Sequence, residues 1–130
     1  QEDPEYDDVT QDICAFLRDR ITACVEAGIS EDLIIVDPGF GFGKTVEHNL
    51  QLLARLDELA VPGLPVVVGL SRKSMIGKLL GLDIAGRLPA SIALAVLAVE
   101  RGARLVRAHD VAATWQAVQM QAAVQRVQQR

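Results

Sequence analysis

The chain has 130 residues, of which 50% are hydrophobic and 23% are charged, and its formal net charge is −4. This length is enough for one domain with a hydrophobic core, and the acidic balance argues against binding of nucleic acid through overall charge. With few aromatic residues, the composition suits a helix-and-sheet interior better than an all-β sandwich or a disulfide scaffold.

Compartment and completeness are read from a few features. The longest apolar run, residues 92–99, is far shorter than the roughly 20 residues that span a bilayer, and no signal peptide is recognisable. Cys14 and Cys24 lie on one predicted helix at a separation of about 15 Å, too far for a disulfide. We therefore expect reduced cysteines and a cytoplasmic protein. Because the chain begins with Gln1 in an acidic lead-in, we expect a piece of a longer protein.

The first half of the chain reads as helix, strand, helix. Apolar residues recur at helical period over 7–27. Residues 33–36 are a short apolar run typical of a buried strand, which ends at Asp37. Thr45 is a good N-cap for a second helix with apolar-periodic positions over 46–59.

The second half repeats the alternation of strand and helix. Its predicted elements are a strand, a short helix, a long helix, a strand and a last helix, over 66–70, 74–80, 89–101, 104–107 and 111–128. The alanine-rich helix over 89–101 is apolar on nearly all sides, so we expect it to be buried between the sheet and another surface, such as a partner subunit. Asp110 is placed to cap the last helix.

Strands that alternate with helices indicate a parallel sheet with crossover helices, hence an α/β fold. In such sheets, binding sites collect at the carboxyl ends of the strands. Here these ends carry Asp37, then Ser71, Arg72 and Lys73, then Arg107 and His109. We therefore expect one site on one rim of the sheet.

Two glycine-bounded turns contain two of the three lysines. Residues 37–45 read Asp-Pro-Gly-Phe-Gly-Phe-Gly-Lys-Thr. They fail the P-loop pattern, because Pro38 stands where its first glycine is required. Three alternate glycines still indicate unusual backbone torsions or a close ligand. Lys73 stands at a helix N-terminus, where the dipole opposes a cation, so a binding role would explain its placement.

Several candidates have a structural interpretation beside the functional one. Asp37 either caps the next turn or accepts paired N–H donors from a heterocycle. The two phenylalanines of residues 37–45 either form a local hydrophobic plug or face a ligand. Arg107 and His109 either pair with Asp110 or form an anion clamp. From the residues alone, the chain is part of an α/β enzyme that binds a phosphorylated or anionic ring compound.

Three segments carry a more specific resemblance. Asp-Pro-Gly-Phe-Gly-Phe-Gly-Lys (37–44), Gly-Leu-Ser-Arg-Lys-Ser-Met-Ile-Gly (69–77) and Arg-Ala-His-Asp (107–110) resemble the later signatures of bacterial dihydropteroate synthases, in order and spacing. That family folds as a (β/α)8 TIM barrel of about 250 residues. The resemblance implies that residues 1–130 are the C-terminal part of such a pterin-binding barrel. They would be roughly its last three β/α units preceded by a helix, with the N-terminal half absent.

The activity implied by the resemblance belongs to folate biosynthesis. The family condenses 6-hydroxymethyl-7,8-dihydropterin diphosphate with p-aminobenzoate to give 7,8-dihydropteroate and diphosphate, and it is the target of sulfonamides. The resemblance implies these small molecules as partners, a homodimer when complete, and no nucleic acid or membrane. It also implies Mg²⁺, with its protein ligand in the absent N-terminal half and no metal ligand in this chain. We expect the 130 residues alone to be inactive.

Roles are carried over at matching positions in three groups. The resemblance implies that pterin is contacted by Asp37, Lys73 and Arg107. It implies that diphosphate is contacted by Arg107 and His109. It implies that p-aminobenzoate is contacted by Phe42, Ser71 and Arg72. Lys73, Arg107 and His109 are the implied catalytic residues, acting by orientation and charge stabilisation.

Two other interpretations stay open. A pterin-dependent methyltransferase of the same superfamily binds the same ring without a diphosphate, so residues 71–74 and 107–110 disfavour it. A catalytically inactive half-barrel that serves in assembly is the other. A turnover assay with size exclusion separates them.

Overall fold

The computed structural model describes residues 6–59 and 63–130 of the chain. The helices and strands within these residues are α1 (Val9–Glu26), α2 (Val46–Ala54), β1 (Val66–Gly69), α3 (Ser74–Leu80), α4 (Leu88–Glu100), β2 (Ala103–Arg107) and α5 (Val111–Gln128). Short 3-10 turns cover Glu31–Leu33, Leu56–Leu59 and Ile84–Gly86. All the predicted helices are therefore confirmed, although the second ends as a 3-10 turn.

Helix starts follow from local side-chain chemistry. The Asp8 carboxylate accepts the N–H of Gln11 at 3.1 Å and caps α1. Thr45 caps α2 as predicted: its hydroxyl accepts the N–H of His48, and the Thr45 N–H donates to His48 Nδ1. His48 thus serves the start of α2.

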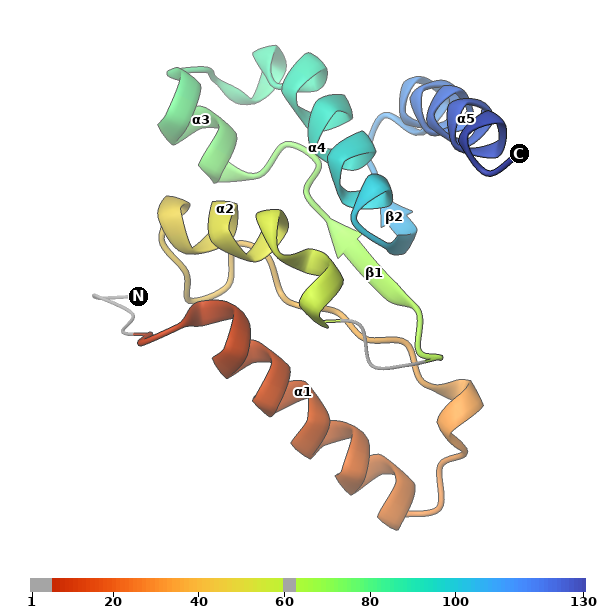
Figure 1. The fold of residues 1–130 in the computed structure, drawn as a ribbon. Helices are drawn as coiled ribbons and strands as arrows, with labels where there is room; N and C mark the ends of the chain where they lie inside the picture. Colours follow the sequence, from red (N-terminus) through yellow and green to blue (C-terminus); the bar gives the residue numbers. More distant parts are fainter. Residues whose placement is uncertain (1–5, 60–62) are drawn as a thin grey trace.

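The centre of the fold is a parallel pair, β1 with β2, joined through α3 and α4 (Figure 1). Their register sets Gly69 opposite Arg107, so both strands end at the same edge. This pairing confirms two of the three predicted strands and the parallel α/β arrangement.

The first predicted strand, residues 33–36, is wrong except at its end. Only Val36 pairs, in a single parallel bridge to Val66, and Leu33 lies in a 3-10 turn. Leu33 and Ile35 are 77% and 52% exposed, whereas Val36 is 3% exposed, so only the end of the run is fully buried. A strand at the edge of a sheet has a neighbour on one side only, and an apolar run cannot indicate how many neighbours it has.

The main core lies between the strands and the first two helices. The larger side chains that are fully buried in it are Leu52, Leu56, Leu59, Leu70 and Val68, and Val9 and Thr10 of α1 are buried as well. In Figure 1, α1 and α2 lie on one side of the strands, and α4 and α5 lie on the other. The core therefore packs against β1.

The far side of the strands is more open. Only Ser91, Ala95 and Ala98 of α4 are buried, where α4 packs on α5 and β2. The prediction that α4 is covered on both sides is thus not met by the described residues, since Leu97 is 38% exposed. Trp115 of α5 is 62% exposed. No helix in the described parts of the chain is long and apolar enough to cross a membrane.

Candidate functional site

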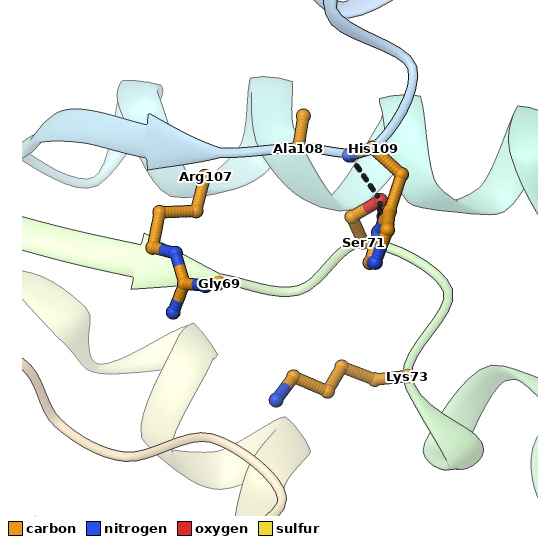
Figure 2. A pocket seen from close by; sticks show the side chains of 6 residues that line it. All are labelled: Gly69, Ser71, Lys73, Arg107, Ala108 and His109. Carbon is orange, nitrogen blue, oxygen red and sulfur yellow. Dashed lines mark hydrogen bonds between the residues drawn. The ribbon is translucent and has the colours of Figure 1, made fainter.

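An open cleft of about 190 Å³ lies at the carboxyl ends of β1 and β2. It is lined by Gly69, Ser71, Lys73, Arg107, Ala108 and His109 (Figure 2). Figure 2 shows the long side chains of Lys73 and Arg107 directed toward the same open space. Four residues that the sequence singled out, Ser71 and Lys73 after one strand and Arg107 and His109 after the other, thus meet on one rim as expected.

Ser71 and His109 connect the two strand ends directly. The His109 N–H donates to Ser71 Oγ at 3.1 Å, and His109 Nδ1 lies 2.9 Å from the same oxygen (Figure 2). The serine expected to face p-aminobenzoate and the histidine expected to face diphosphate are therefore in direct contact with each other.

Three consecutive residues after β1, Ser71, Arg72 and Lys73, form a turn that we call the Ser-Arg-Lys turn. Arg72 does not line the cleft: its guanidinium donates to both carboxylate oxygens of Asp110, at 2.9 and 3.2 Å. The hydrogen bonds from Arg72 hold the pKa of the Asp110 carboxyl below its ordinary value, and the pair raises the pKa of Arg72. Asp110 precedes α5, but its side chain makes no capping bond, because Arg72 occupies it.

The glycine loop, residues 37–45, is tied together by its own polar groups. The Asp37 carboxylate accepts the Gly39 N–H at 2.8 Å, which confirms that it caps the turn and leaves its second oxygen available. Lys44 Nζ donates to the carbonyls of Gly39 and Phe42 at 2.8 and 3.0 Å, and burial lowers its pKa. Gly39, Gly41 and Gly43 have φ of 73°, 86° and 63°, which confirms the unusual torsions predicted from their spacing.

The two phenylalanines of the glycine loop have opposite environments. Phe40 is 2% exposed and belongs to the core, as the plug interpretation required. Phe42 is 72% exposed, and Lys73 Nζ lies 4.9 Å from the centroid of its ring. This cation–π contact brings the tip of the glycine loop to the cleft. Gly41 lies there too, since a Cβ on it would stand 3.6 Å from Lys73 Cδ.

Sequence reasoning missed the residues that support the site. Asn49 of α2 accepts the Gly41 N–H at 2.9 Å and fixes the glycine loop. Ser91 and Arg87 bind the main chain of the Ser-Arg-Lys turn. Ser91 had one signal, as a polar residue in an otherwise apolar helix, whereas Arg87 had none that distinguishes it from a surface arginine.

The positions of the carboxylates, imidazoles and thiols bear on metal binding. Within residues 6–59 and 63–130, no group of three or more His, Cys, Asp or Glu side chains is arranged to hold a metal ion. The described residues therefore show no cluster of this kind for the Mg²⁺ that the resemblance implies.

Comparison with known proteins extends these observations. A family model described as "Pterin binding enzyme" matches residues 1–109. The dihydropteroate synthase of Haemophilus influenzae is 50% identical over 123 residues, which cover 90% of this chain and 45% of that protein.

Solved structures agree with the sequence comparison. The Yersinia pestis dihydropteroate synthase with a sulfonamide drug complex superposes with a TM-score of 0.95 and 46% identity, covering 98% of this chain and 46% of that one. The Xanthomonas albilineans dihydropteroate synthase in complex with 7,8-dihydropteroate superposes with a TM-score of 0.91 and 49% identity, covering 94% of this chain and 47% of that one. The chain thus spans less than half the length of these relatives.

Proposed function

This chain belongs to the family of pterin binding enzymes, and from that premise we propose that it forms the pterin- and diphosphate-binding part of a dihydropteroate synthase. One observation carries the proposal: Lys73, Arg107 and His109 meet in one cleft at the carboxyl ends of two parallel strands. Two cations and an imidazole suit a highly charged phosphate group beside a polar ring. The nature of the relatives supports this substrate class.

We extend the proposal to the fold, as roughly the last three β/α units of a (β/α)8 barrel preceded by a helix. The β1–β2 pair and the bridge from Val36 to Val66 support three parallel neighbours in chain order. An apolar groove of about 280 Å³ beside β2, lined in part by Val106 and Trp115, supports a further neighbour on that side. A barrel closes only when all its strands are present.

Pterin and diphosphate are assigned to separate parts of the rim. Asp37 accepts N–H donors from the amino-pyrimidine edge with its second oxygen, and Lys73 donates to the oxygen and nitrogen acceptors of the ring. Arg107 covers the pterin face and, with His109, holds the diphosphate. The charge-assisted bonds among these are the strong ones.

The reaction then needs orientation and charge stabilisation. The C–O bond between the pterin methylene and the diphosphate breaks, and its electron pair leaves with the diphosphate, where Arg107 and His109 stabilise the added charge. The amine nitrogen of p-aminobenzoate donates its lone pair to the cationic methylene carbon, and the C–N bond forms as an amine proton passes to water. No enzyme nucleophile is required.

The aryl substrate is assigned to Phe42 and Ser71. Phe42 offers an exposed ring beside Lys73, and Ser71 offers a hydroxyl inside the cleft. Arg72, expected to join them, has its guanidinium engaged by Asp110, so we assign it to holding the turn.

Three further parts of the proposal concern the complete enzyme. Its Mg²⁺ would use ligands from outside the described residues. A homodimer is supported by exposed apolar side chains on α4 and α5, such as Leu97 and Trp115. A reducing, cytoplasmic setting is supported by Cys14 and Cys24, which are not joined in a disulfide. No nucleic acid is proposed as a partner.

The test uses this chain joined behind the N-terminal part of the Haemophilus influenzae synthase that precedes the matched region, called the joined enzyme below. We expect the joined enzyme to form 7,8-dihydropteroate from dihydropterin diphosphate and p-aminobenzoate. Arg107→Gln should lower kcat and raise KM for the diphosphate substrate, because one charged hydrogen bond contributes about 1.5–3 kcal/mol.

Two controls make the result decisive. Arg101→Gln, at the far end of α4, should leave both parameters unchanged, since the Arg101 side chain bonds only to the Leu97 carbonyl among the described residues. The 130 residues alone should show no turnover. A joined enzyme that folds and binds neither substrate, or an isolated chain as active as a full-length synthase, would contradict the proposal.

A further inference from the structure

Arg72 has an unusual backbone. Its φ is 57°, and it is the single non-glycine residue with positive φ in the described part of the chain. In this left-handed region the Cβ of an L-residue crowds its own carbonyl, so residues other than glycine adopt it only when neighbouring groups hold them there. The neighbours of Arg72 in sequence, Ser71 and Lys73, are the two side chains that this turn presents to the cleft.

Both polar groups of the Arg72 main chain are bound by the start of α4. The Arg72 N–H donates to Ser91 Oγ at 2.9 Å, and the Arg72 carbonyl accepts from an Arg87 terminal nitrogen at 3.0 Å. Ser91 is 6% exposed, and its hydroxyl donates to the Arg87 carbonyl at 2.7 Å. Ser91 Oγ thus accepts from the Ser-Arg-Lys turn and donates to the residue that precedes α4.

Arg87 is itself held in a fitted place. Its Nε and its second terminal nitrogen donate to the Leu82 carbonyl, each at 3.2 Å. Gly77 of α3 provides the room, because a Cβ there would collide with the Arg87 guanidinium and stand 2.8 Å from the Leu82 carbonyl. One guanidinium therefore joins α3, the segment after it and the Ser-Arg-Lys turn.

We infer that Arg87 and Ser91 are positioning residues: they hold Arg72 in the left-handed conformation and thereby set Ser71 and Lys73 in the cleft. Neither side chain lines the cleft, so both act through the turn. The inference deepens the proposed function and rests on it for the identity of the ligand. Its geometric part, from Arg87 and Ser91 to Ser71, stands without that identity.

The chain offers a direct readout of the position of Ser71. It contains two histidines, and each Nδ1 has a different partner: His109 lies against Ser71 Oγ, and His48 accepts the Thr45 N–H. Nitrogen-15 chemical shifts of the two imidazoles report their tautomers and hydrogen bonds. His48 therefore serves as an internal control in the same spectrum.

The experiment records these spectra for the 130-residue chain and its Ser91→Ala and Arg87→Gln variants. We expect the His109 Nδ1 shift to move toward that of exchanging tautomers in both variants, while His48 stays unchanged. Arg101→Gln, the same substitution at the other end of α4, should move neither. Ser91→Thr, which keeps the hydroxyl, should restore the His109 signal. Ser91→Ala removes one oxygen atom and its two hydrogen bonds, so it keeps the test informative if Arg87→Gln does not fold.

The joined enzyme supplies the functional arm. Ser91→Ala should lower kcat/KM for the dihydropterin diphosphate about tenfold, and Ser91→Thr should recover most of the loss. An unchanged His109 signal in Ser91→Ala would overturn the inference, whatever the activity. A shifted His109 signal beside a joined enzyme that makes no dihydropteroate, even without substitutions, would instead overturn the proposed function and leave the positioning in place.

Discussion

The glycine loop and the Ser-Arg-Lys turn both follow strand ends and both contain a lysine, yet the two lysines do opposite things. The ammonium group of Lys44 donates to two carbonyls of its own loop. The ammonium group of Lys73 makes no hydrogen bond within residues 6–59 and 63–130, and it points into the cleft. The glycine loop is held largely by its own residues, whereas the turn is held by Ser91, Arg87 and Asp110 from other elements.

This difference teaches how a binding cation is recognised. A lysine that satisfies its own loop has already used its donors, and its contribution is to stability. A lysine presented by a turn that other elements hold keeps its donors for a ligand. The distinction lies in what binds the backbone around each lysine, which residue type and glycine spacing do not reveal.

Matched Lys→Met substitutions break the comparison most strongly. In the joined enzyme, Lys73→Met should weaken pterin binding by about 1.5–3 kcal/mol, or roughly 10- to 150-fold, because it removes a charged donor. Its unfolding free energy should barely change. Lys44→Met should do the reverse, costing about 1–3 kcal/mol of stability as two carbonyls lose their donor.

Calorimetry of pterin binding and urea unfolding measure the two effects. If both variants lose the same property, whether affinity or stability, the contrast between the two lysines is wrong. An unchanged pterin affinity in Lys73→Met would remove that residue from the proposed site.

Asp37 shares features of both regions, since one oxygen caps the glycine loop and the other is available. Asp37→Asn keeps an oxygen for the Gly39 N–H but turns an amide donor toward the N–H groups of the pterin. We expect an affinity loss of about 1–3 kcal/mol, or roughly 5- to 150-fold, with little loss of stability.

Asp83→Asn is the matched control for this change. Asp83 also caps a turn, by accepting the Gly86 N–H at 3.1 Å, but it follows helix α3 and is not part of the glycine loop; neither carboxylate lines the cleft. Equal affinities in Asp37→Asn and the unsubstituted enzyme would confine Asp37 to its structural role.

The external support of the turn predicts a pH dependence. Because the pKa of Asp110 is lowered in the folded chain by its bonds to Arg72, the pair stabilises the fold above the unfolded-state pKa of about 3.9 and is lost as pH falls through the folded value. Asp110→Asn should therefore flatten the fall of the unfolding free energy below about pH 4. Urea titrations at several pH values measure the slope. Asp57→Asn, at a carboxylate without an ion pair in the described residues, should keep it.

How far the sequence predicts the molecule differs between its parts. Helix starts at Asp8 and Thr45 depend on bonds within a few residues, and so do the torsions of the glycine loop, which is why local patterns were sufficient. The rim was predictable because parallel strands end at one edge. The strand prediction for residues 33–35 was wrong because strand pairing depends on neighbouring strands, which an apolar run does not reveal.

The hydrogen-bond partners of Arg72 were not predicted, for a related reason. Asp110 is 38 positions away along the chain and Ser91 is 19 away, so no spacing rule connects them to the turn. Arg72 itself looked suited to a carboxylate ligand, and the structure supplies a carboxylate from the chain itself. The prediction of a ligand carboxylate for Arg72 did not anticipate this partner within the chain.

The smallest effect concerns the two phenylalanines, and it tests the comparison within the glycine loop alone. Phe40 faces the core at 2% exposure, and Phe42 lies 72% exposed beneath the Lys73 ammonium. Phe42→Leu removes an exposed cation–π contact, which is worth about 0.5–1 kcal/mol, so p-aminobenzoate binding to the joined enzyme should weaken only about two- to fivefold. Phe40→Leu changes core packing instead and should lower the unfolding free energy by up to about 1.5 kcal/mol without a direct effect on the aryl substrate. Both quantities are measured on both variants, by competition binding and by urea unfolding. A stability loss in Phe42→Leu as large as that in Phe40→Leu would mean that the loop tip packs as part of the fold, and Phe42 would then have no separate part in receiving the aryl ring.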